Sequence, residues 1–252
     1  MGLIKNLKNR LYKFWIKLRF LFLFVVLFGL IGGAIYLLYF TDYFVLRKIE
    51  VKNNKKVRKE EIIKLTGLRG EERLFRISLK DIRNRLLKNS YIEDVMIARK
   101  LPDTLEIIVK EREPLGIIKK AKSFYLIDKE GVTICPASSK DFDFYPLLEL
   151  RNKDYKKKFL NFLKWIKENS MYLPVYANLS KIVLDKEKIY FYTKRRLIIY
   201  FPLVCEKDWI FLYKNLDKVV TYLYKKEIIE EVELIRMDYP LGSALIKFKE
   251  KI

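Results

Sequence analysis

The sequence predicts an α+β protein in which an N-terminal transmembrane helix precedes two folded domains. Three observations favour this class. Residues 20–41 form an apolar stretch without a charge. Residues 42–113 alternate short strand and helix patterns in the order β-α-α-β-β. Residues 114–252 carry mostly strand patterns, with a long amphipathic helix towards the C-terminal end.

The apolar stretch is long enough to cross a bilayer. Its 22 residues, Phe20 to Thr41, span about 30 Å as a helix. The run exceeds the apolar core of a secretory signal peptide and no small-residue cleavage site follows it, so we expect a retained helix. Gly29 and Gly33 form a GxxxG pattern, which is only a weak indication of helix pairing. Aromatic residues lie near both ends of the stretch: Trp15, Tyr36, Tyr39 and Tyr43.

The charges beside this helix predict its orientation. Residues 1–19 carry six basic and no acidic side chains, which is typical of a cytoplasmic tail. The far side is also basic within its first twenty residues, but large folded domains cross membranes with little regard to charge. We therefore expect a single-pass protein of the bacterial inner (cytoplasmic) membrane, with residues 1–19 inside and residues 42–252 outside.

Short elements of alternating type predict the first domain, residues 42–113. Gly67 is a stop signal for its first helix, and Ser78 or Asp81 opens the second. We expect both helices to cover one face of a small sheet. The predicted elements are a strand at 47–52, a helix at 57–66, a helix from 78 or 81 to about 87, and strands at 95–99 and 104–110.

The second domain, residues 114–252, is predicted to be mostly β. The turn 128–131 joins two strands of a hairpin, and a terminal strand is expected at a sheet edge. On the last helix, Trp209, Leu216 and either Val219 or Val220 are expected to be core. The predicted strands are 116–119, 124–127, 132–134, 182–184, 189–193, 197–201, 231–237 and 243–249, and the predicted helices are 155–169 and 206–226.

The composition excludes several kinds of catalytic and metal site. The chain has no histidine, so histidine-based catalysis and histidine-ligated zinc are excluded. Its two cysteines, Cys135 and Cys205, cannot form a four-thiolate site, and whether they pair stays open. The acidic residues that a glycan hydrolase would need lie beside turns and loops: Asp128, Glu130, Asp141, Asp143, Asp185 and Glu187. We therefore expect no enzymatic activity, no cofactor and no small-molecule substrate.

The net charge of +21 raises the question of nucleic-acid binding. Basic residues are spread through every predicted element, however, and no nucleic-acid-binding motif is present. We expect no nucleic-acid function. The basic run from Lys52 to Lys59 is either a solvated face or a surface attracted to anionic lipid headgroups.

Several motifs, in this order, resemble the FtsQ family of cell-division proteins, called DivIB in some bacteria. Residues 44–51 resemble the strand that enters the family's POTRA domain, and residues 74–77 its short aromatic motif. Residues 92–107 resemble its central hairpin, including the Arg-x-x-Pro turn. Residues 111–115 are similar to its Glu-Arg-x-Pro junction, and residues 124–131 to its Asp-x-x-Gly hairpin. The resemblance covers roughly residues 1 to 249.

The resemblance implies a non-enzymatic scaffold that helps to recruit and regulate septal peptidoglycan synthesis at the division septum. It implies that residues 42–113 are a POTRA domain contacting other divisome proteins, and that residues 114–252 are a β domain. It further implies that FtsB/DivIC-like and FtsL-like partners add a strand to the last β-strand and contact the preceding helix. The implied binding residues are Tyr239, Gly242, Ser243, Ala244, Leu245, Ile246 and Lys247.

Two features leave alternatives open. Tyr239 is either part of this partner site or a turn aromatic that packs on its own sheet. The family often has an arginine just before this tyrosine, whereas this chain has Asp238, and Arg236 or Lys247 is a candidate replacement.

The alternative function is that of a POTRA-bearing, membrane-anchored chaperone or translocation protein, which would also bind by strand addition.

Overall fold

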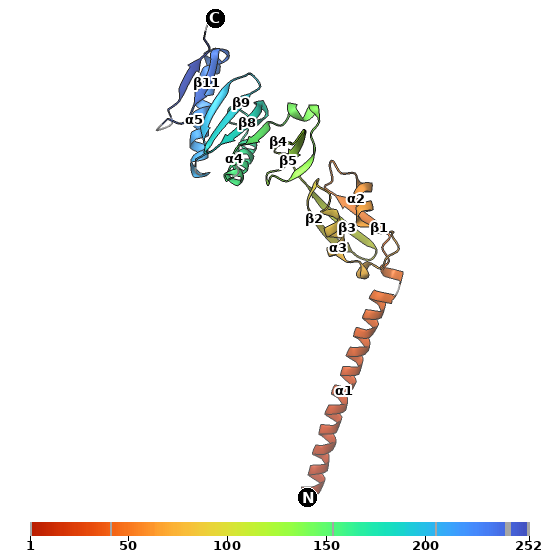
Figure 1. The fold of residues 1–252 in the computed structure, drawn as a ribbon. Helices are drawn as coiled ribbons and strands as arrows, with labels where there is room; N and C mark the ends of the chain where they lie inside the picture. The colour runs from red at the N-terminus through yellow and green to blue at the C-terminus, as the bar shows by residue number, and fades with distance from the viewer. Residues whose placement is uncertain (1, 41, 153, 205, 240–242, 251–252) are drawn as a thin grey trace. The chain divides into compact units, whose positions relative to one another are not determined.

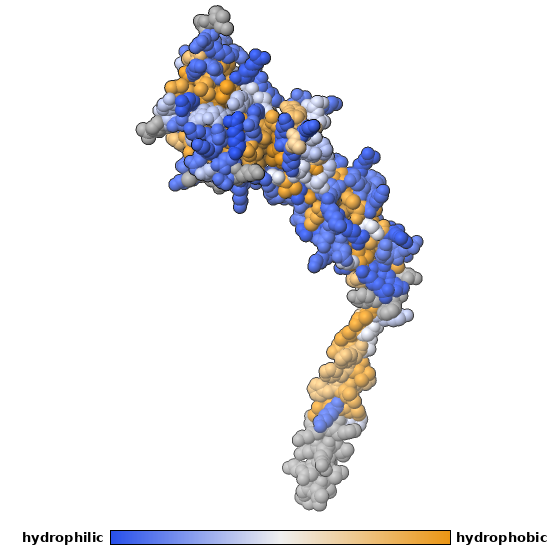
Figure 2. Space-filling model, viewed as in Figure 1, coloured by the Kyte–Doolittle hydropathy of each residue, from blue (hydrophilic) through white to orange (hydrophobic). Residues whose placement is uncertain are grey.

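The computed structural model of the protein describes residues 2–40, 42–152, 154–204, 206–239 and 243–250. The first element is a long helix, α1 (Gly2–Phe40) (Figure 1). Its part from Trp15 to Leu37 has a mean hydropathy of 2.6 and is not buried inside the protein. Figure 2 shows a mostly apolar surface along this part. Among the described residues, α1 is the helix that is long and apolar enough to cross a membrane.

The chain divides into two compact units, Met1–Glu111 and Arg112–Ile252. Beyond α1, the first unit has a three-stranded sheet of order β1-β3-β2, in which β3 is parallel to β1 and antiparallel to β2. Its elements are η1 (Asp42–Phe44), β1 (Lys48–Lys52), α2 (Lys59–Thr66), η2 (Leu74–Arg76), α3 (Leu79–Leu86), β2 (Ile92–Lys100) and β3 (Thr104–Glu111). The predicted β-α-α-β-β order is confirmed.

Alternation along β3 builds the core of the first unit. Leu105, Ile107 and Val109 are buried and share one cluster with Ile62 of α2 and Ile82 of α3. Both helices therefore cover the same face of the sheet, as predicted. Ser78 caps α3 by accepting a hydrogen bond from the backbone N–H of Asp81. The helix expected from residue 57 begins only at Lys59.

The second unit contains a nine-stranded sheet of order β12-β11-β10-β9-β8-β7-β4-β5-β6. The eight predicted strands are present, with ends that differ by a few residues, and β7 is an addition to them. Its four residues are too few to show an alternating pattern. The strands are β4 (Gly116–Lys120), β5 (Ser123–Ile127), β6 (Thr133–Pro136), β7 (Leu147–Leu150), β8 (Leu179–Asp185), β9 (Lys188–Thr193), β10 (Ile198–Pro202), β11 (Val232–Arg236) and β12 (Leu245–Phe248).

Two helices, α4 (Lys156–Glu168) and α5 (Glu206–Lys225), pack on this sheet through aromatic rings (Figure 1). Phe162 of α4 is fully buried, and its ring centroid lies 5.3 Å from that of Phe201 on β10 and 5.1 Å from that of Trp209 on α5. The rings of Phe191 and Tyr213 complete this cluster. Trp209 and Leu216 are buried in the core, as predicted, and so is Val220 rather than Val219. The α+β class with a mostly-β second domain and a long helix near its C-terminal end is confirmed.

Two adjacent residues mark the end of one unit and the beginning of the next. The carboxylate of Glu111 accepts hydrogen bonds from the backbone N–H groups of Lys55, Lys56 and Val57, all within the first unit. Arg112 forms a largely buried ion pair with Asp128 of the second unit. Glu111 is therefore bonded within the first unit, and Arg112 within the second.

The aromatic cluster generates a prediction about stability. We expect Phe162→Ala to lower the free energy of unfolding of the second unit by about 3–5 kcal/mol, because the lost ring leaves a cavity among rigid neighbours. Denaturant unfolding of the full chain in detergent, followed by the fluorescence of Trp165 and Trp209, measures this loss. The control is Met171→Ala, which truncates an exposed side chain and should change the value by no more than about 0.5 kcal/mol. Equal stabilities for the two variants would contradict the prediction.

The Glu111 contacts generate a prediction about pH. Burial alone would raise the pKa of Glu111, but the three N–H groups outweigh it and hold the pKa below 4.5, its ordinary value. The folded state therefore favours the ionised form, and this stabilisation is complete at neutral pH and lost as the pH falls below about 4.5 through the folded pKa. We expect Glu111→Gln to lower stability at pH 7 and to weaken its dependence on acid. Urea unfolding across this pH range tests the expectation, with Glu60→Gln on α2, which removes one carboxylate and leaves the Glu111 contacts in place, as the matched control.

Candidate functional site

The candidate site is the outer edge of β12. In the strand order β12 is terminal and pairs with β11, and among the described residues no strand pairs with its other side. An edge strand of this kind presents backbone N–H and C=O groups to solvent or to a partner. The predicted position of the last strand at a sheet edge is thus observed.

The direction of the backbone groups follows from one hydrogen bond. The N–H of Lys249 donates to the carbonyl of Glu231 at 2.7 Å, so Lys249 faces the β11 side of the strand. Because N–H directions alternate along an antiparallel strand, Lys247 and Leu245 also face β11. The N–H groups of Ile246 and Phe248 then point away from β11, to the open edge.

The side chains of β12 alternate as well. Ala244 and Ile246 pack against the core of the second unit, whereas Leu245 is 41% exposed. Phe248 is 45% exposed at the end of the strand. Lys247 points outward, and its ammonium lies 2.8 Å from the carboxylate of Glu233. The edge therefore offers two apolar side chains beside its free backbone groups.

Tyr239 belongs to a small network at the entrance to this strand. The residue is 39% exposed, and the guanidinium of Arg236 lies 5.6 Å from the centroid of its ring. The same guanidinium lies 5.2 Å from the centroid of Tyr200 on β10. Arg236 also donates to both carboxylate oxygens of Asp238, at 3.2 and 2.7 Å, and this contact raises its pKa above the ordinary arginine value. Tyr239 thus packs on its own sheet and keeps part of its ring accessible.

The seven predicted binding residues are placed differently by the structure. Leu245, Ile246 and Lys247 lie in β12, while Ser243 and Ala244 precede it, so the strand begins two residues later than expected. Gly242 lies outside the described residues. Phe248 and Tyr200 are contributors that the sequence analysis did not include, and Arg236 was expected there only as a candidate replacement for the family arginine. Alternation alone could have pointed to the outward N–H of Phe248, but the stacking of Arg236 depends on the sheet order.

The described residues offer no cluster of metal ligands, and Cys135 is the cysteine among them. Within the described ranges, no group of three or more cysteine, aspartate and glutamate side chains is close enough to hold a metal ion. Cys135 is a half-buried free thiol. Cys205, the other cysteine with which it could pair, lies outside the described residues. The arrangement at β12 presents backbone N–H and C=O groups of the kind with which an added strand pairs.

Comparisons with known proteins agree with this architecture. Residues 44–112 match the family model of the FtsQ-type POTRA domain. The chain is 36% identical over 114 residues to the cell division protein DivIB of Clostridium tetani, an alignment that covers 45% of this chain and 43% of the relative. It is 33% identical over 121 residues to the cell division protein FtsQ of Geotalea daltonii, covering 48% and 44%. The resemblance inferred from the motifs is confirmed.

The matched parts are limited in length. The alignments span less than half of the length of these curated relatives. A solved structure, the major extracytoplasmic domain of the trans isomer of DivIB from Geobacillus stearothermophilus, matches with a TM-score of 0.33 and 10% identity, covering 46% of this chain and 97% of that one. The POTRA assignment therefore rests on residues 44–112.

The Arg236 network generates a prediction. We expect Arg236→Gln to change the free energy of unfolding only slightly, because its ion pair and ring contacts are partly exposed and screened by solvent. Ile235→Ala, which truncates the fully buried neighbour on β11, should cost about 2–5 kcal/mol. Urea unfolding of both variants measures the difference. A large loss for Arg236→Gln would mean that the network supports the fold and not only the surface of the edge.

Proposed function

We propose that this chain is a single-pass, non-enzymatic scaffold of the bacterial cell-division machinery that binds a partner strand at the edge of β12. The observation that carries the proposal is the unpaired edge of β12 in a chain whose residues 44–112 match the FtsQ-type POTRA domain. Its relatives named as cell division proteins support the same role. Edge strands bind extended peptides through backbone hydrogen bonds, and alternate side chains supply specificity.

The membrane arrangement forms part of the proposal. Residues 1–19 face the cytoplasm, residues 20–41 cross the inner membrane, and the POTRA domain (42–113) and β domain (114–252) lie outside it, at the division septum. The apolar surface of α1 supports the membrane span, and the basic residues before it support the orientation. The proposed partners are FtsB/DivIC-like and FtsL-like proteins, with further divisome proteins at the POTRA domain.

The charges at the edge favour one form of binding over another. Both candidate replacements for the family arginine already have partners in this chain, since Arg236 pairs with Asp238 and Lys247 pairs with Glu233. A partner carboxylate would have to displace one of these acids. We therefore expect binding to depend on backbone hydrogen bonds and on the exposed side chains of Leu245 and Phe248, and to be only weakly sensitive to salt.

A pair of substitutions at Phe248 tests this mode of binding. Phe248→Pro removes a backbone N–H that points to the open edge and leaves the donors facing β11 in place. Phe248→Ala removes the same side chain but keeps the N–H. We expect the proline variant to weaken binding of the FtsB/DivIC-like extracytoplasmic segment about tenfold more than the alanine variant does, through the lost bond and the steric bulk of the ring. Co-purification and titration with the full chain in detergent measure both affinities.

The controls separate docking from folding. Urea unfolding should show similar stabilities for the two Phe248 variants, and Tyr239→Ala should weaken binding while the second unit remains folded. If the folded Phe248→Pro variant binds the segment as tightly as the wild type does, the partner site lies somewhere other than β12. If the wild type does not bind this segment at all, the alternative of a POTRA-bearing chaperone or translocation protein is favoured.

A further inference from the structure

The first unit of the fold has two distinct ends. β1 begins at Lys48, soon after α1, and β3 ends at Glu111, where the unit itself ends. Because β1 and β3 are parallel, the chain enters the unit at one end of the sheet and leaves it at the other. The turn 101–103 lies at the first of these, which we call the entry end, since the carbonyl of Asp103 accepts a hydrogen bond from the N–H of Arg47 at 2.9 Å.

Exposed apolar side chains collect at the entry end. Among residues 42–111, as far as the structure describes them, the exposed large apolar side chains are Tyr43, Leu101 and Met96. Tyr43 is 67% exposed and lies shortly before β1, and Leu101 is 58% exposed in the turn between β2 and β3. Met96 lies in the middle of β2, opposite Ile108 of β3. Exposed apolar groups that gather at one end of a domain indicate a contact surface.

Three aromatic rings form a row at this end. The ring of Tyr43 packs edge-to-face on that of Phe44, with 5.0 Å between the ring centroids. Phe44 packs in the same way on Phe75 of η2 at 5.2 Å, and both of these residues are half-buried. Two segments that are far apart in the sequence thus present one aromatic surface. Together with the turn between β2 and β3 it forms what we call the entry rim, which consists of Tyr43, Phe44, Phe75 and Leu101.

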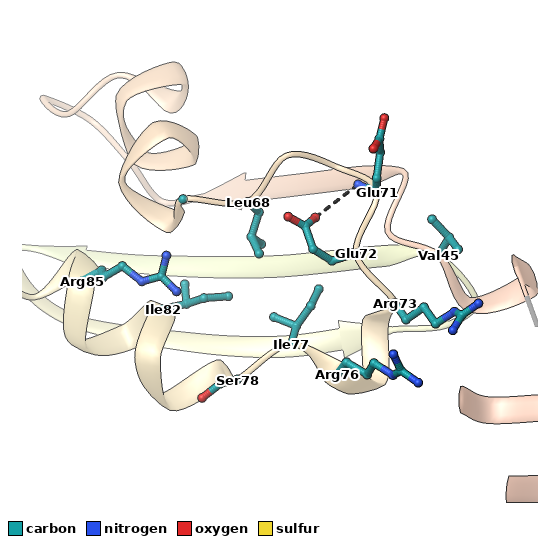
Figure 3. A pocket seen from close by; sticks show the side chains of 11 residues that line it. Val45, Leu68, Glu71, Glu72, Arg73, Arg76, Ile77, Ser78, Ile82 and Arg85 are labelled. Atoms are coloured by element: carbon teal, nitrogen blue, oxygen red, sulfur yellow. Dashed lines mark hydrogen bonds between the residues drawn. The ribbon is translucent and has the colours of Figure 1, made fainter. Parts of the chain in front are cut away.

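The rest of the fold fixes the backbone of the entry rim. Arg99 of β2 donates to the carbonyls of Leu74 and Ile77, at 2.9 and 2.7 Å, and so holds η2 on both sides of its aromatic ring. Val45 forms a β-bridge with Arg73. Figure 3 shows this turn next to Val45, with the side chain of Arg73 extending away from the neighbouring pocket. A surface that is already ordered loses less conformational entropy when it binds.

A short connection joins the entry rim to the apolar helix. Five residues lead from Phe40, the end of α1, to Val45, and they span at most about 18 Å when fully extended. β3, in contrast, extends over eight residues, or about 26 Å, from the entry end to Glu111. If α1 crosses the bilayer, the connection therefore brings the entry rim within reach of the membrane surface, and the length of the strands separates it from the other end of the sheet.

We infer that the entry rim lies in the interface between the outer leaflet of the membrane and water, among the lipid headgroups and the upper parts of the acyl chains. Tyrosine is enriched at this depth because its ring is apolar and its hydroxyl stays hydrated. Insertion of Tyr43 and Leu101 removes exposed apolar surface from water. The inference rests on the proposed membrane span and goes beyond the proposed function, because it assigns the first unit a lipid contact of its own.

The basic run from Lys52 to Lys59 then belongs to the opposite end of the unit. Lys52 is the last residue of β1, and its ammonium is paired with Glu106. The backbone N–H of Lys56 donates to the carboxylate of Glu111, where β3 ends. Of the two interpretations of this run, the solvated face is therefore favoured over a surface for anionic headgroups.

Quenching of tryptophan fluorescence by brominated lipid tests the inference. The full chain is reconstituted into phosphatidylcholine vesicles whose acyl chains are either unmodified or brominated in their upper part. Each variant adds one tryptophan, and its difference from the wild type gives the emission of that tryptophan. We expect bromination to remove roughly half or more of the emission added by Leu101→Trp, because interfacial rings lie beside the upper acyl chains. The matched control is Met96→Trp, an exposed position in the same unit whose added emission should stay unchanged.

A second reporter reads the same surface from another segment. Phe75→Trp places a tryptophan on η2, and we expect bromination to quench its added emission as it does for Leu101→Trp. Urea unfolding of each variant establishes that it is folded before its quenching is compared. A folded Phe75→Trp protein whose added emission does not respond to bromination would overturn the inference, even if Leu101→Trp fails to fold.

A further variant separates this inference from the proposal on which it rests. Phe28 lies on the exposed apolar surface of α1, and Phe28→Trp should be quenched strongly if the helix crosses the bilayer. Quenching of Phe28→Trp without quenching of Leu101→Trp would overturn the lipid contact of the entry rim and leave the membrane span standing. No quenching in either variant would contradict the span itself, and the inference with it. Equal quenching of Leu101→Trp and Met96→Trp would mean that the unit lies on the membrane by the face of its sheet, which would also overturn the inference.

Discussion

The packing of aromatic rings around Phe162 is the interaction on which the second unit depends. It joins α4 and α5 to β9 and β10, in the middle of a sheet that does not close. β11 pairs with β10, and β12 pairs with β11, and both outer strands also place side chains in or against the same core. Burial of large rings thus stabilises a structure that leaves backbone groups open at its end, and that open end is the candidate binding site.

Carboxylates in this chain mostly satisfy backbone donors and cations of their own unit. Asp128 accepts the N–H groups of Glu130 and Val132 besides its ion pair with Arg112. Glu72 and Glu111 close loops of the first unit in the same way. Glu72 and Glu111 are poor candidates for a general base, because these donors stabilise their ionised forms. In the described residues these acids therefore stabilise the fold of their own unit.

Much of the fold was predictable because its elements have clear periods. Buried residues repeat every second position on β3 and every third or fourth on α4, and both patterns can be counted in the sequence. β7 was not predicted, because its four residues are too few to show a period. The start of β12 was predicted two residues too early. At the candidate site, the strand was predicted from its residue pattern, whereas its binding role and that of Tyr239 were predicted from the resemblance. The pairing of Arg236 with Asp238, and its stacking on Tyr200, were not predictable because they depend on the neighbouring strand.

The sequence by itself determined the apolar helix, the order of the elements and the absence of histidine chemistry, since these depend on composition and on local periodicity. Only the tertiary structure decided that β12 ends the sheet among the described residues, and that Arg236 and Lys247 already have partners. The physical reason is that each of these features joins residues whose contact is set by strand order and packing, which local sequence patterns do not encode.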